Sequence, residues 1–364
     1  MGQRIYLDHA ATTPLVPEAK AAMALALEQW ANPSSPHHEG RAARAALEEA
    51  RERIRAGLGW PHEVIFTSGA TEAAALALTR AAGDPSAIVS AIEHQAVLRQ
   101  RPDAAVVPVN ASGAIEGAAL DALLAEQPRR VVAIQHVNSE TGVIQPIAAL
   151  AERVRAGGGL LFSDCAQSAG KLPLPPADLI ALSAHKLGGP PGIGALLVRD
   201  LRMLRPAGSG QEQGYRPGTE NLPAILGFAA AVEAMPVGPQ LPAWMVERQR
   251  WRGELDKIVR AAGGAVICPR APRSPLIASY RMPGMSAAAQ LMRFDAQGFA
   301  VAAGSACSSG TMRTSHVLRA LGLAEEAAGQ VIRVSFGRET SKSEIDLFAA
   351  AWADMAGEAK ARAA

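Results

Sequence analysis

The sequence predicts an α/β protein whose large unit is a mainly parallel, seven-stranded sheet with helices on both faces, joined to a smaller α+β unit. Seven short apolar runs lie between residues 63 and 199, and most are separated by segments long enough for a helix. The runs are apolar throughout rather than alternating, which is typical of parallel strands covered on both faces. A Pro- and Gly-rich segment, Pro236–Pro242, then separates this region from one with a different pattern.

The chain before the sheet is predicted to be helical. Pro17–Trp30 is rich in Ala and Leu at helical spacing, and Arg41–Leu58 carries its charges on one face. Between them, Asn32–Gly40 is rich in Pro, Ser and Asn, which indicates a loop. His37 and His38 in this loop could serve as metal ligands, but adjacent histidines in such a loop are expected to be solvated. No metal site is therefore predicted.

The seven candidate strands share a short length and a high content of Val, Ile, Leu and Ala. They are Glu63–Ser68, Ala87–Ile92, Ala104–Val109, Val131–Val137, Leu160–Asp164, Leu179–Ala184 and Gly194–Arg199. Helices between them are predicted at Thr71–Ala82 and Pro146–Ala156. The last two strands are joined only by HKLGGPPGIG, which is too short for a crossover helix, so we expect this pair to be antiparallel.

The region after the boundary has the mixed pattern of an α+β unit. Its candidate helices are Met245–Gly263, Ala287–Gln297, His316–Leu321 and Ser343–Met355, and its candidate strands are Ala265–Pro269, Leu276–Met282, Ala300–Gly304 and Ile332–Gly337. The predicted division is a large unit over residues 14–238 and a smaller unit formed by residues 1–13 and 239–364.

Composition and charge exclude several classes of protein. The 364 residues carry 36 Lys and Arg against 34 Asp and Glu, and 4% are aromatic. Neither value suits a nucleic-acid binder that uses a basic face or aromatic stacking. No apolar run reaches the roughly 18 residues that a membrane span needs. The N-terminus lacks the pattern of a signal peptide, and three scattered cysteines do not form a disulfide framework. A cytoplasmic protein that binds neither nucleic acid nor membrane is expected.

Polar residues that could take part in catalysis or ligand binding follow five of the predicted strands. The segments are Gly69–Glu72, Glu93–His94, Asn138–Gly142, Asp164–Gln167 and Ser183–Lys186. Functional residues of parallel α/β sheets gather at the carboxyl edge of the strands, so these segments are expected to share one site. The first is a small-residue turn opening a helix, and free N–H groups at a helix N-terminus suit a phosphate.

Lys186 lies between an apolar strand and a Gly- and Pro-rich turn, where a solvated lysine has no special use. A desolvated lysine near other cations has a lowered pKa and forms Schiff bases. Asp164 at the end of a neighbouring strand could face a pyridinium nitrogen. Pyridoxal 5′-phosphate needs three groups from a protein: a lysine for its aldehyde, a carboxylate for its ring nitrogen and a helix N-terminus for its phosphate.

Nine segments together resemble the cysteine desulfurases, a group within the class V aminotransferases of the fold-type I pyridoxal-phosphate enzymes. They are YLDHAATTP, FTSGATEA, IEHQAVL, HVNSETGVIQP, SDCAQSAGK, SAHKLGGPPGIGALLVR, QEQGYRPGTEN, GSACSSG and IRVSFGRET. The resemblance extends from about Tyr6 to Asp346. It implies the fold of that group, pyridoxal phosphate as cofactor and L-cysteine as substrate.

The resemblance also implies roles for individual residues. Lys186 would form the Schiff base and move the proton of the substrate α-carbon. Asp164 would pair with the pyridine nitrogen, and Gln167 would hydrogen-bond the phenolic oxygen of the ring. His94 would stack on the ring and serve as an acid and base. The residues that would hold the phosphate are Ala70, Thr71, Ser183 and His185.

Three further roles follow from the same resemblance. Thr219 would reach the phosphate of the neighbouring subunit, which implies a homodimer. Arg338 would bind the substrate carboxylate bidentately, with Ser139 also at the substrate. Cys307, among small polar residues, would be the nucleophile that takes sulfur from cysteine as a persulfide while alanine leaves. Cys165 and Cys268 lie in or beside apolar strands and are expected to be buried.

The sequence departs from the usual pattern of the group at three places. Ser139 stands where most members have Asn, Asp8-His9 replaces Asp-Asn, and Ala73–Ala75 replaces a segment that contains Asn. The chain also ends sooner than housekeeping members, whose tail helps to dock a scaffold protein. Delivery of sulfur to iron-sulfur clusters or to another acceptor protein therefore stays open.

Two other functions remain open from the sequence. One is a selenocysteine lyase or another pyridoxal-phosphate lyase of the same group, although a plain eliminase needs no acceptor thiol such as Cys307. The other is a non-catalytic paralogue, which the residues at Ser139 and Ala73–Ala75 favour and the intact Lys186 and Asp164 oppose.

Overall fold

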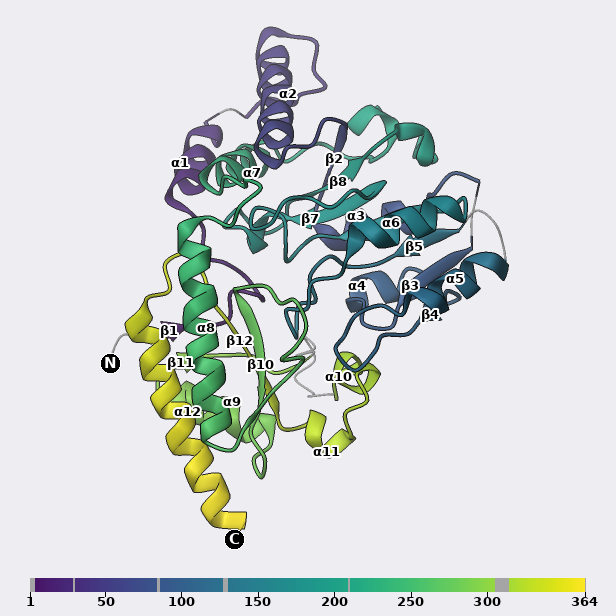
Figure 1. Ribbon diagram of the computed structural model, residues 1–364. Coiled ribbons are helices and arrows are strands. Elements are labelled where there is room, and N and C mark those ends of the chain that lie inside the picture. Colours follow the sequence, from purple (N-terminus) through teal and green to yellow (C-terminus); the bar gives the residue numbers. More distant parts are fainter. Residues whose placement is uncertain are drawn as a thin grey trace.

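A seven-stranded sheet forms the larger part of the computed structural model, which describes residues 4–28, 30–83, 86–126, 130–208, 210–304 and 314–363 (Figure 1). Its strands are β2 (Glu63–Thr67), β3 (Ala87–Ser90), β4 (Ala105–Val107), β5 (Val131–Ala133), β6 (Leu160–Asp164), β7 (Leu179–Ser183) and β8 (Gly194–Val198). All seven predicted strands are confirmed, most with shorter ends; the expected Val131–Val137 strand stops at Ala133.

The strand order is β2-β8-β7-β6-β5-β3-β4. Strand β8 is antiparallel to both of its neighbours, β7 and β2, while the other pairs are parallel. The predicted antiparallel pairing of β7 with β8 is thus confirmed. Because β8 is the one reversed strand of this sheet, β2 runs in the same direction as the parallel strands. The carboxyl ends of β2, β7, β6, β5 and β3 therefore lie at one edge.

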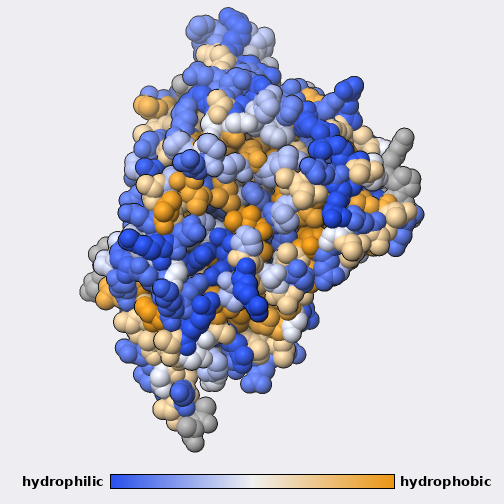
Figure 2. Space-filling view, in the orientation of Figure 1, coloured by the Kyte–Doolittle hydropathy of each residue, from blue (hydrophilic) through white to orange (hydrophobic). Residues whose placement is uncertain are grey.

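Helices cover both faces of this sheet, as the sequence predicts. They are α1 (Pro17–Ala26), α2 (His38–Leu58), α3 (Ala70–Thr79), α4 (Gln95–Leu98), α5 (Gly117–Glu126), α6 (Ile147–Ala156) and α7 (Leu222–Ala234). Alternate strand residues point to opposite faces: Ile65 packs with α3, whereas Val64 and Phe66 pack with α2 and α7. In Figure 2 the end of the molecule formed by α2 is mostly hydrophilic, in keeping with its charged outer face.

Helix α2 begins three residues before the predicted helix. His37 is its N-cap, and the Nδ1 atom of this side chain accepts a hydrogen bond from the backbone N–H of Gly40. A capping interaction of this kind satisfies an N–H that the first turn leaves free. The expectation of a loop over the whole of Asn32–Gly40 was therefore wrong at its end, and His37 has a capping role.

The smaller part of the chain contains a three-stranded antiparallel sheet and a two-stranded parallel one. Its elements are β1 (Ile5–Tyr6), α8 (Ala243–Ala261), β9 (Ala265–Val266), β10 (Ile277–Arg281), α9 (Ala287–Ala296), β11 (Phe299–Ala300), α10 (His316–Ala320), α11 (Glu325–Ala328), β12 (Val331–Ser335) and α12 (Lys342–Ala363). The sheet orders are β12-β10-β9 and β1-β11. Helices α8 and α12 lie side by side and pack on an apolar cluster that includes Trp352, Phe348 and Tyr280 (Figure 1).

Two predicted elements of this part differ from the structure. Helix α12 continues to Ala363 rather than stopping at Met355, because Ala, Lys and Arg, which favour helix, fill its last turns. The strand expected at Ala300–Gly304 is reduced to Phe299–Ala300 in β11. The division of the chain at residues 13 and 238 stays a prediction. None of the helices in the described ranges combines the length and apolar character that a membrane crossing requires.

A buried ion pair ties α2 to the edge of the large sheet. The Nη1 and Nη2 atoms of Arg51 each lie 2.9 Å from an oxygen of Glu212. Oε2 of Glu212 also accepts a hydrogen bond of 2.7 Å from the backbone N–H of Phe66, and Arg51 donates to the carbonyl oxygen of Val64. Since both side chains are buried, removing one would leave the other charge without its partner.

We expect Arg51→Met to lower the free energy of unfolding by about 3–5 kcal/mol, the usual loss when one partner of a buried pair is removed. The matched control is Arg53→Met on the same helix. Arg53 pairs with Glu233, but the two side chains are 32% and 47% exposed, so its loss should be about 1 kcal/mol or less. Urea denaturation measures both. Equal losses for the two variants would contradict the assignment.

Candidate functional site

A cavity of about 640 Å³ lies at the carboxyl edge of the seven-stranded sheet. This volume is in the range of small-molecule sites. Every strand end singled out in the sequence contributes to its wall. The wall residues that were predicted from the sequence are Ala70, Thr71, His94, Ser139, Asp164, Gln167, Ser183, His185 and Lys186. The expectation that these segments share one site is therefore confirmed.

One end of the cavity is suited to an anion. Helix α3 begins there after Gly69, whose φ of 151° is in a region that residues with a side chain rarely adopt. A Cβ atom at this position would lie 3.3 Å from Oγ of Ser183, so the turn also needs a small residue. The N–H groups of the first turn and the positive end of the helix dipole lie at the cavity wall, where they suit a phosphate.

Lys186 reaches the cavity from the short 3-10 helix Ala184–Lys186 that follows β7. Its Nζ atom donates to the carbonyl oxygens of Ala10, at 2.6 Å, and Ala11, at 2.7 Å. Burial, together with the nearby guanidinium of Arg333, lowers the pKa of Lys186 to about 8. Near neutral pH this lysine is therefore far more often in the neutral form, which attacks carbonyl groups, than a solvated lysine is.

Asp164 ends β6 and lies at the cavity wall. Its Oδ1 atom accepts a hydrogen bond from the backbone N–H of Ala166, 2.9 Å away, which fixes the carboxylate. Burial raises the pKa of Asp164, and the nearby His94 and Lys186 oppose that rise. A cationic ring nitrogen placed against this carboxylate would hold it ionised.

Two further wall residues are neutral hydrogen-bonding groups. The Nε2 atom of Gln167 donates to the carbonyl oxygen of Ala10 at 2.8 Å, while its Oε1 atom is buried without a partner among the described residues. The Nδ1 atom of His94 accepts from the backbone N–H of Ala96, so its proton lies on Nε2. Desolvation lowers the pKa of His94, which keeps the ring neutral.

These residues fit pyridoxal 5′-phosphate. The helix N-terminus suits its phosphate, Lys186 its aldehyde carbon and Asp164 its ring nitrogen. The amide of Gln167, whose second polar atom lacks a partner, suits an oxygen on the ring. The cavity thus offers one complementary group for each functional group of the cofactor.

The predicted carboxylate-binding arginine, Arg338, is not at the cavity. Its side chain is exposed and donates 2.8 Å to the carbonyl oxygen of Ala234. It lies beyond the end of β12, and its hydrogen-bond partner is the last residue of α7. Arg333, five residues earlier and within β12, lines the cavity instead. The sequence did carry a signal for it, because an arginine inside an apolar strand is rarely buried unless it is paired or functional.

Glu93 and Glu140 lie in segments that were expected at this site but were given no individual role, whereas His316 was not predicted to line it. Nε2 of His316 donates 2.8 Å to the carbonyl oxygen of Glu93. Burial raises the pKa of the Glu93 carboxyl well above its ordinary value. Glu140 accepts a hydrogen bond from Oγ of Ser315, the N-cap of α10. These contacts join the ends of β3 and β5 to the smaller part of the chain.

Thr219 is exposed and does not line this cavity. It borders a separate cavity of about 40 Å³ that shares Ser68 and Gly192 with the large one. Its predicted contact with a neighbouring subunit stays a prediction.

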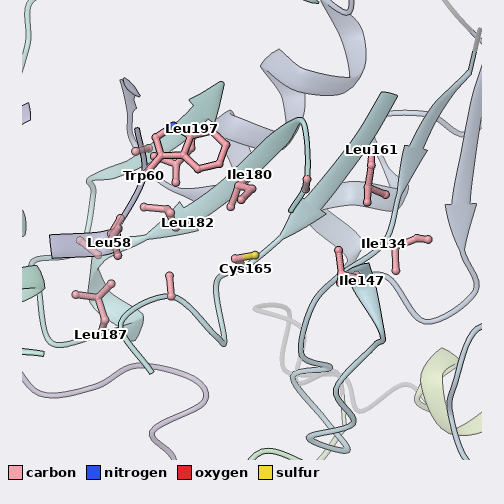
Figure 3. Close-up of a cluster of buried hydrophobic side chains, with 14 of the residues drawn as sticks. Leu58, Trp60, Ile134, Ile147, Leu161, Cys165, Ile180, Leu182, Leu187 and Leu197 are labelled. Atoms are coloured by element: carbon pink, nitrogen blue, oxygen red, sulfur yellow. The ribbon is translucent and has the colours of Figure 1, made fainter. Parts of the chain in front are cut away.

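The cysteines divide as the sequence suggested, as far as the structure describes them. Cys165 and Cys268 are buried, and burial raises their pKa values to about 12 and about 11. Figure 3 shows Cys165 among apolar side chains that include Ile180, Leu182 and Ile147. Neither is therefore a ready nucleophile, since the thiolate is the reactive form. Cys307 lies outside the described residues.

Comparison with known proteins identifies relatives along nearly the whole chain. Residues 5–348 match the aminotransferase class-V family. A cysteine desulfurase of Cereibacter sphaeroides is 37% identical, over 94% of this chain and 93% of its own length. The cysteine desulfurase IscS of Dictyoglomus turgidum is 34% identical, over 95% of this chain and 93% of its own length.

Solved structures agree with these relatives. A NifS-like protein from Rickettsia africae superimposes with a TM-score of 0.89 at 29% identity, over 97% of this chain and 99% of that one, which confirms the fold-type I architecture. SspA in complex with cysteine gives a TM-score of 0.78 at 31% identity, over 93% of this chain and 100% of that one. With a family match over most of its length and relatives above 30% identity across nearly all of it, the chain belongs to the class V aminotransferase family.

Proposed function

We propose that the protein is a pyridoxal-phosphate-dependent cysteine desulfurase, which converts L-cysteine to L-alanine and leaves the sulfur as a persulfide on Cys307. The observation that carries this proposal is the meeting of Lys186, Asp164, Gln167 and the N-terminus of α3 in one cavity. The names of the relatives at 37% and 34% identity support the reaction.

The cofactor would be held by residues at the carboxyl edge of the sheet. Asp164 would bind the ring nitrogen, Gln167 the phenolic oxygen, and His94 would lie against the ring. The phosphate would be held by Ala70, Thr71, Ser183 and His185. Bound there, the ring would withdraw electrons from the substrate α-carbon and make its proton acidic.

The protein's own groups would then handle the substrate. Arg333 would bind the α-carboxylate with two N–H groups, beside Ser139 in the same wall. Lys186, with its pKa of about 8, would take the α-proton and return it elsewhere on the substrate. The neutral ring of His94 would act as a donor, because its Nε2–H is not used by Ala96 and is free to give a proton.

Cys307 would be the nucleophile in the sulfur-transfer step. Its thiolate would attack the sulfur of cysteine, so that a new S–S bond forms and the C–S bond of the substrate breaks. The electron pair of the broken bond would stay on the substrate, whose β-carbon takes up a proton before alanine is released. The sulfur would then pass to an acceptor protein, for iron-sulfur clusters or another sulfur-consuming pathway. The burial of Cys165 and Cys268 supports this choice of nucleophile.

A homodimer completes the proposal. Thr219 lies on the surface and borders a small cavity that shares two of its lining residues, Ser68 and Gly192, with the large one. In a symmetric dimer this exposed hydroxyl would reach the phosphate of the partner's site.

The decisive experiment is incubation of purified holoenzyme with L-cysteine, followed by detection of alanine and of persulfide. The wild-type protein should gain about 32 Da on Cys307 by mass spectrometry. Lys186→Ala should lower alanine formation by about 10²–10⁴-fold or more, since a proton-transferring group is removed. Cys307→Ser should keep its cofactor yet carry no sulfur. An adduct on Cys165 or Cys268 with Cys307 unmodified would contradict the assignment.

The two arginines provide a second test. Arg333→Gln should raise KM for L-cysteine by about a hundredfold, because losing a charge-assisted carboxylate contact costs about 2–5 kcal/mol and 1.4 kcal/mol is tenfold. Arg338→Gln, five residues away, should leave KM unchanged. Steady-state kinetics of both variants decide between them, and the opposite pattern would restore Arg338 as the carboxylate-binding residue.

The lowered pKa of Lys186 predicts how cofactor loading depends on pH. Only the neutral amine attacks the aldehyde, and its fraction rises with pH until the pKa is passed. The rate of covalent attachment of pyridoxal phosphate to apoprotein should therefore rise up to about pH 8 and then level off. An ordinary lysine, with a pKa of about 10.4, would keep gaining beyond that point. Stopped-flow absorbance measures the rate, with Lys186→Ala as the control, and a steady rise to pH 10 would contradict the shift.

A further inference from the structure

A short segment near the N-terminus, Asp8–Thr13, joins the two parts of the chain at the cavity; we call it the N-terminal strap. On one side it is tied to β12, because the backbone N–H of Ala10 donates 2.8 Å to Oγ of Ser335. On the other side the backbone N–H of Thr13 donates 2.9 Å to the carbonyl oxygen of His185. Asp8, Ala10 and Ala11 line the cavity wall. The strap therefore lies where the smaller part of the chain meets the carboxyl edge of the large sheet.

The side chain of Asp8 is paired with Arg333. Its Oδ1 atom lies 2.7 Å from Nη2 of Arg333, and the two side chains are 21% and 10% exposed. Nη1 of the same guanidinium donates 3.0 Å to the carbonyl oxygen of Ser139. Among the described residues, Asp8 is the one carboxylate hydrogen-bonded to Arg333. Two separate contacts, from the strap and from the loop after β5, thus fix the plane of the guanidinium.

These contacts leave donors for a ligand. A guanidinium has five N–H groups, and the contacts with Asp8 and Ser139 use two of them. The Nε atom of Arg333 is buried, so the N–H groups left for a ligand are the second ones of Nη1 and Nη2. An arginine that lines a cavity and is oriented by others, with donors to spare, is preorganised for a planar anion such as a carboxylate.

The same strap also contacts the lysine in the cavity wall. The carbonyl oxygens of Ala10 and Ala11 accept hydrogen bonds from Lys186, and that of Ala10 accepts from Gln167 as well. The strap is therefore in direct contact with both the arginine and the lysine of the site. A shift of Asp8 would move the carboxylate-binding group relative to the lysine.

We propose that Asp8 is a positioning residue, which orients Arg333 for the α-carboxylate of an amino-acid substrate. The inference rests on the proposed function, in which Arg333 binds that carboxylate. Asp8 itself does not touch the substrate. Its removal should weaken only those ligands that carry a carboxylate.

Titration of the holoenzyme with L-alanine and with ethylamine tests this, because the two amines differ only by the carboxylate. In Asp8→Asn the apparent Kd for L-alanine, read from the absorbance of the bound cofactor, should rise by about tenfold or more, as expected when a supporting contact is loosened. The Kd for ethylamine should stay unchanged. KM for L-cysteine should rise with that of L-alanine while kcat changes much less, the pattern of lost substrate binding.

The matched control is Asp295→Asn, which removes a carboxylate from an exposed pair with Arg4. It should change neither Kd. Asp8→Glu keeps the charge and should recover part of the L-alanine affinity, and it replaces Asp8→Asn if that variant does not fold.

Equal weakening of L-alanine and ethylamine, or no change in either, would overturn the proposal. Failure of the proposed function has a different signature, because wild-type holoenzyme would then form no alanine from cysteine. The comparison of the two amines would still report on Asp8 in that case.

Discussion

The site depends on the common direction of the strands in the large sheet. Only β8 among its seven strands is reversed, so β2, β7, β6, β5 and β3 all present their carboxyl ends to one edge. Peptide N–H groups, helix N-termini and the first residues of each loop converge there because of backbone geometry alone. A lysine, a carboxylate and an anion cradle then need only the right residue at the end of each strand. The N-terminal strap closes this edge by its contacts with Lys186 and Arg333.

Residues at strand ends could be placed at the site from the sequence alone, because each one directly adjoins its strand in the chain. Asp164, Lys186 and His94 end apolar runs or closely follow them. An error of a residue or two in the predicted end of the strand leaves each of them at the same edge of the sheet. Arg333 and Arg338 could not be separated in this way. Both belong to IRVSFGRET, and which of them faces the cavity depends on where β12 ends and on its pairing with β10. Both depend on contacts between residues far apart in the chain, which the motif itself does not encode.

Contacts between distant parts of the chain were also beyond the sequence. Asp8 and Arg333 are 325 residues apart, and Arg51 and Glu212 are 161 apart. In each pair a charged side chain lies at a position that a local pattern would leave to solvent. Burial of such a group is explained only once its partner is known. The sequence therefore predicted residues of the cavity wall better than the charged residues that orient or brace other side chains.

The departures from the usual pattern of the family fall at places where the structure has its own reason for the residue. Ala73 and Ala74 are buried against the sheet, where small side chains let α3 approach closely. His9 is buried over Gly337, where any Cβ would lie within 2.1 Å of its ring, so this histidine and this glycine fit each other. Ser139 holds Arg333 through its carbonyl oxygen, a group that every residue has. The contact at position 139 therefore survives a change of side chain there, whereas the contact from position 8 depends on the carboxylate of Asp8.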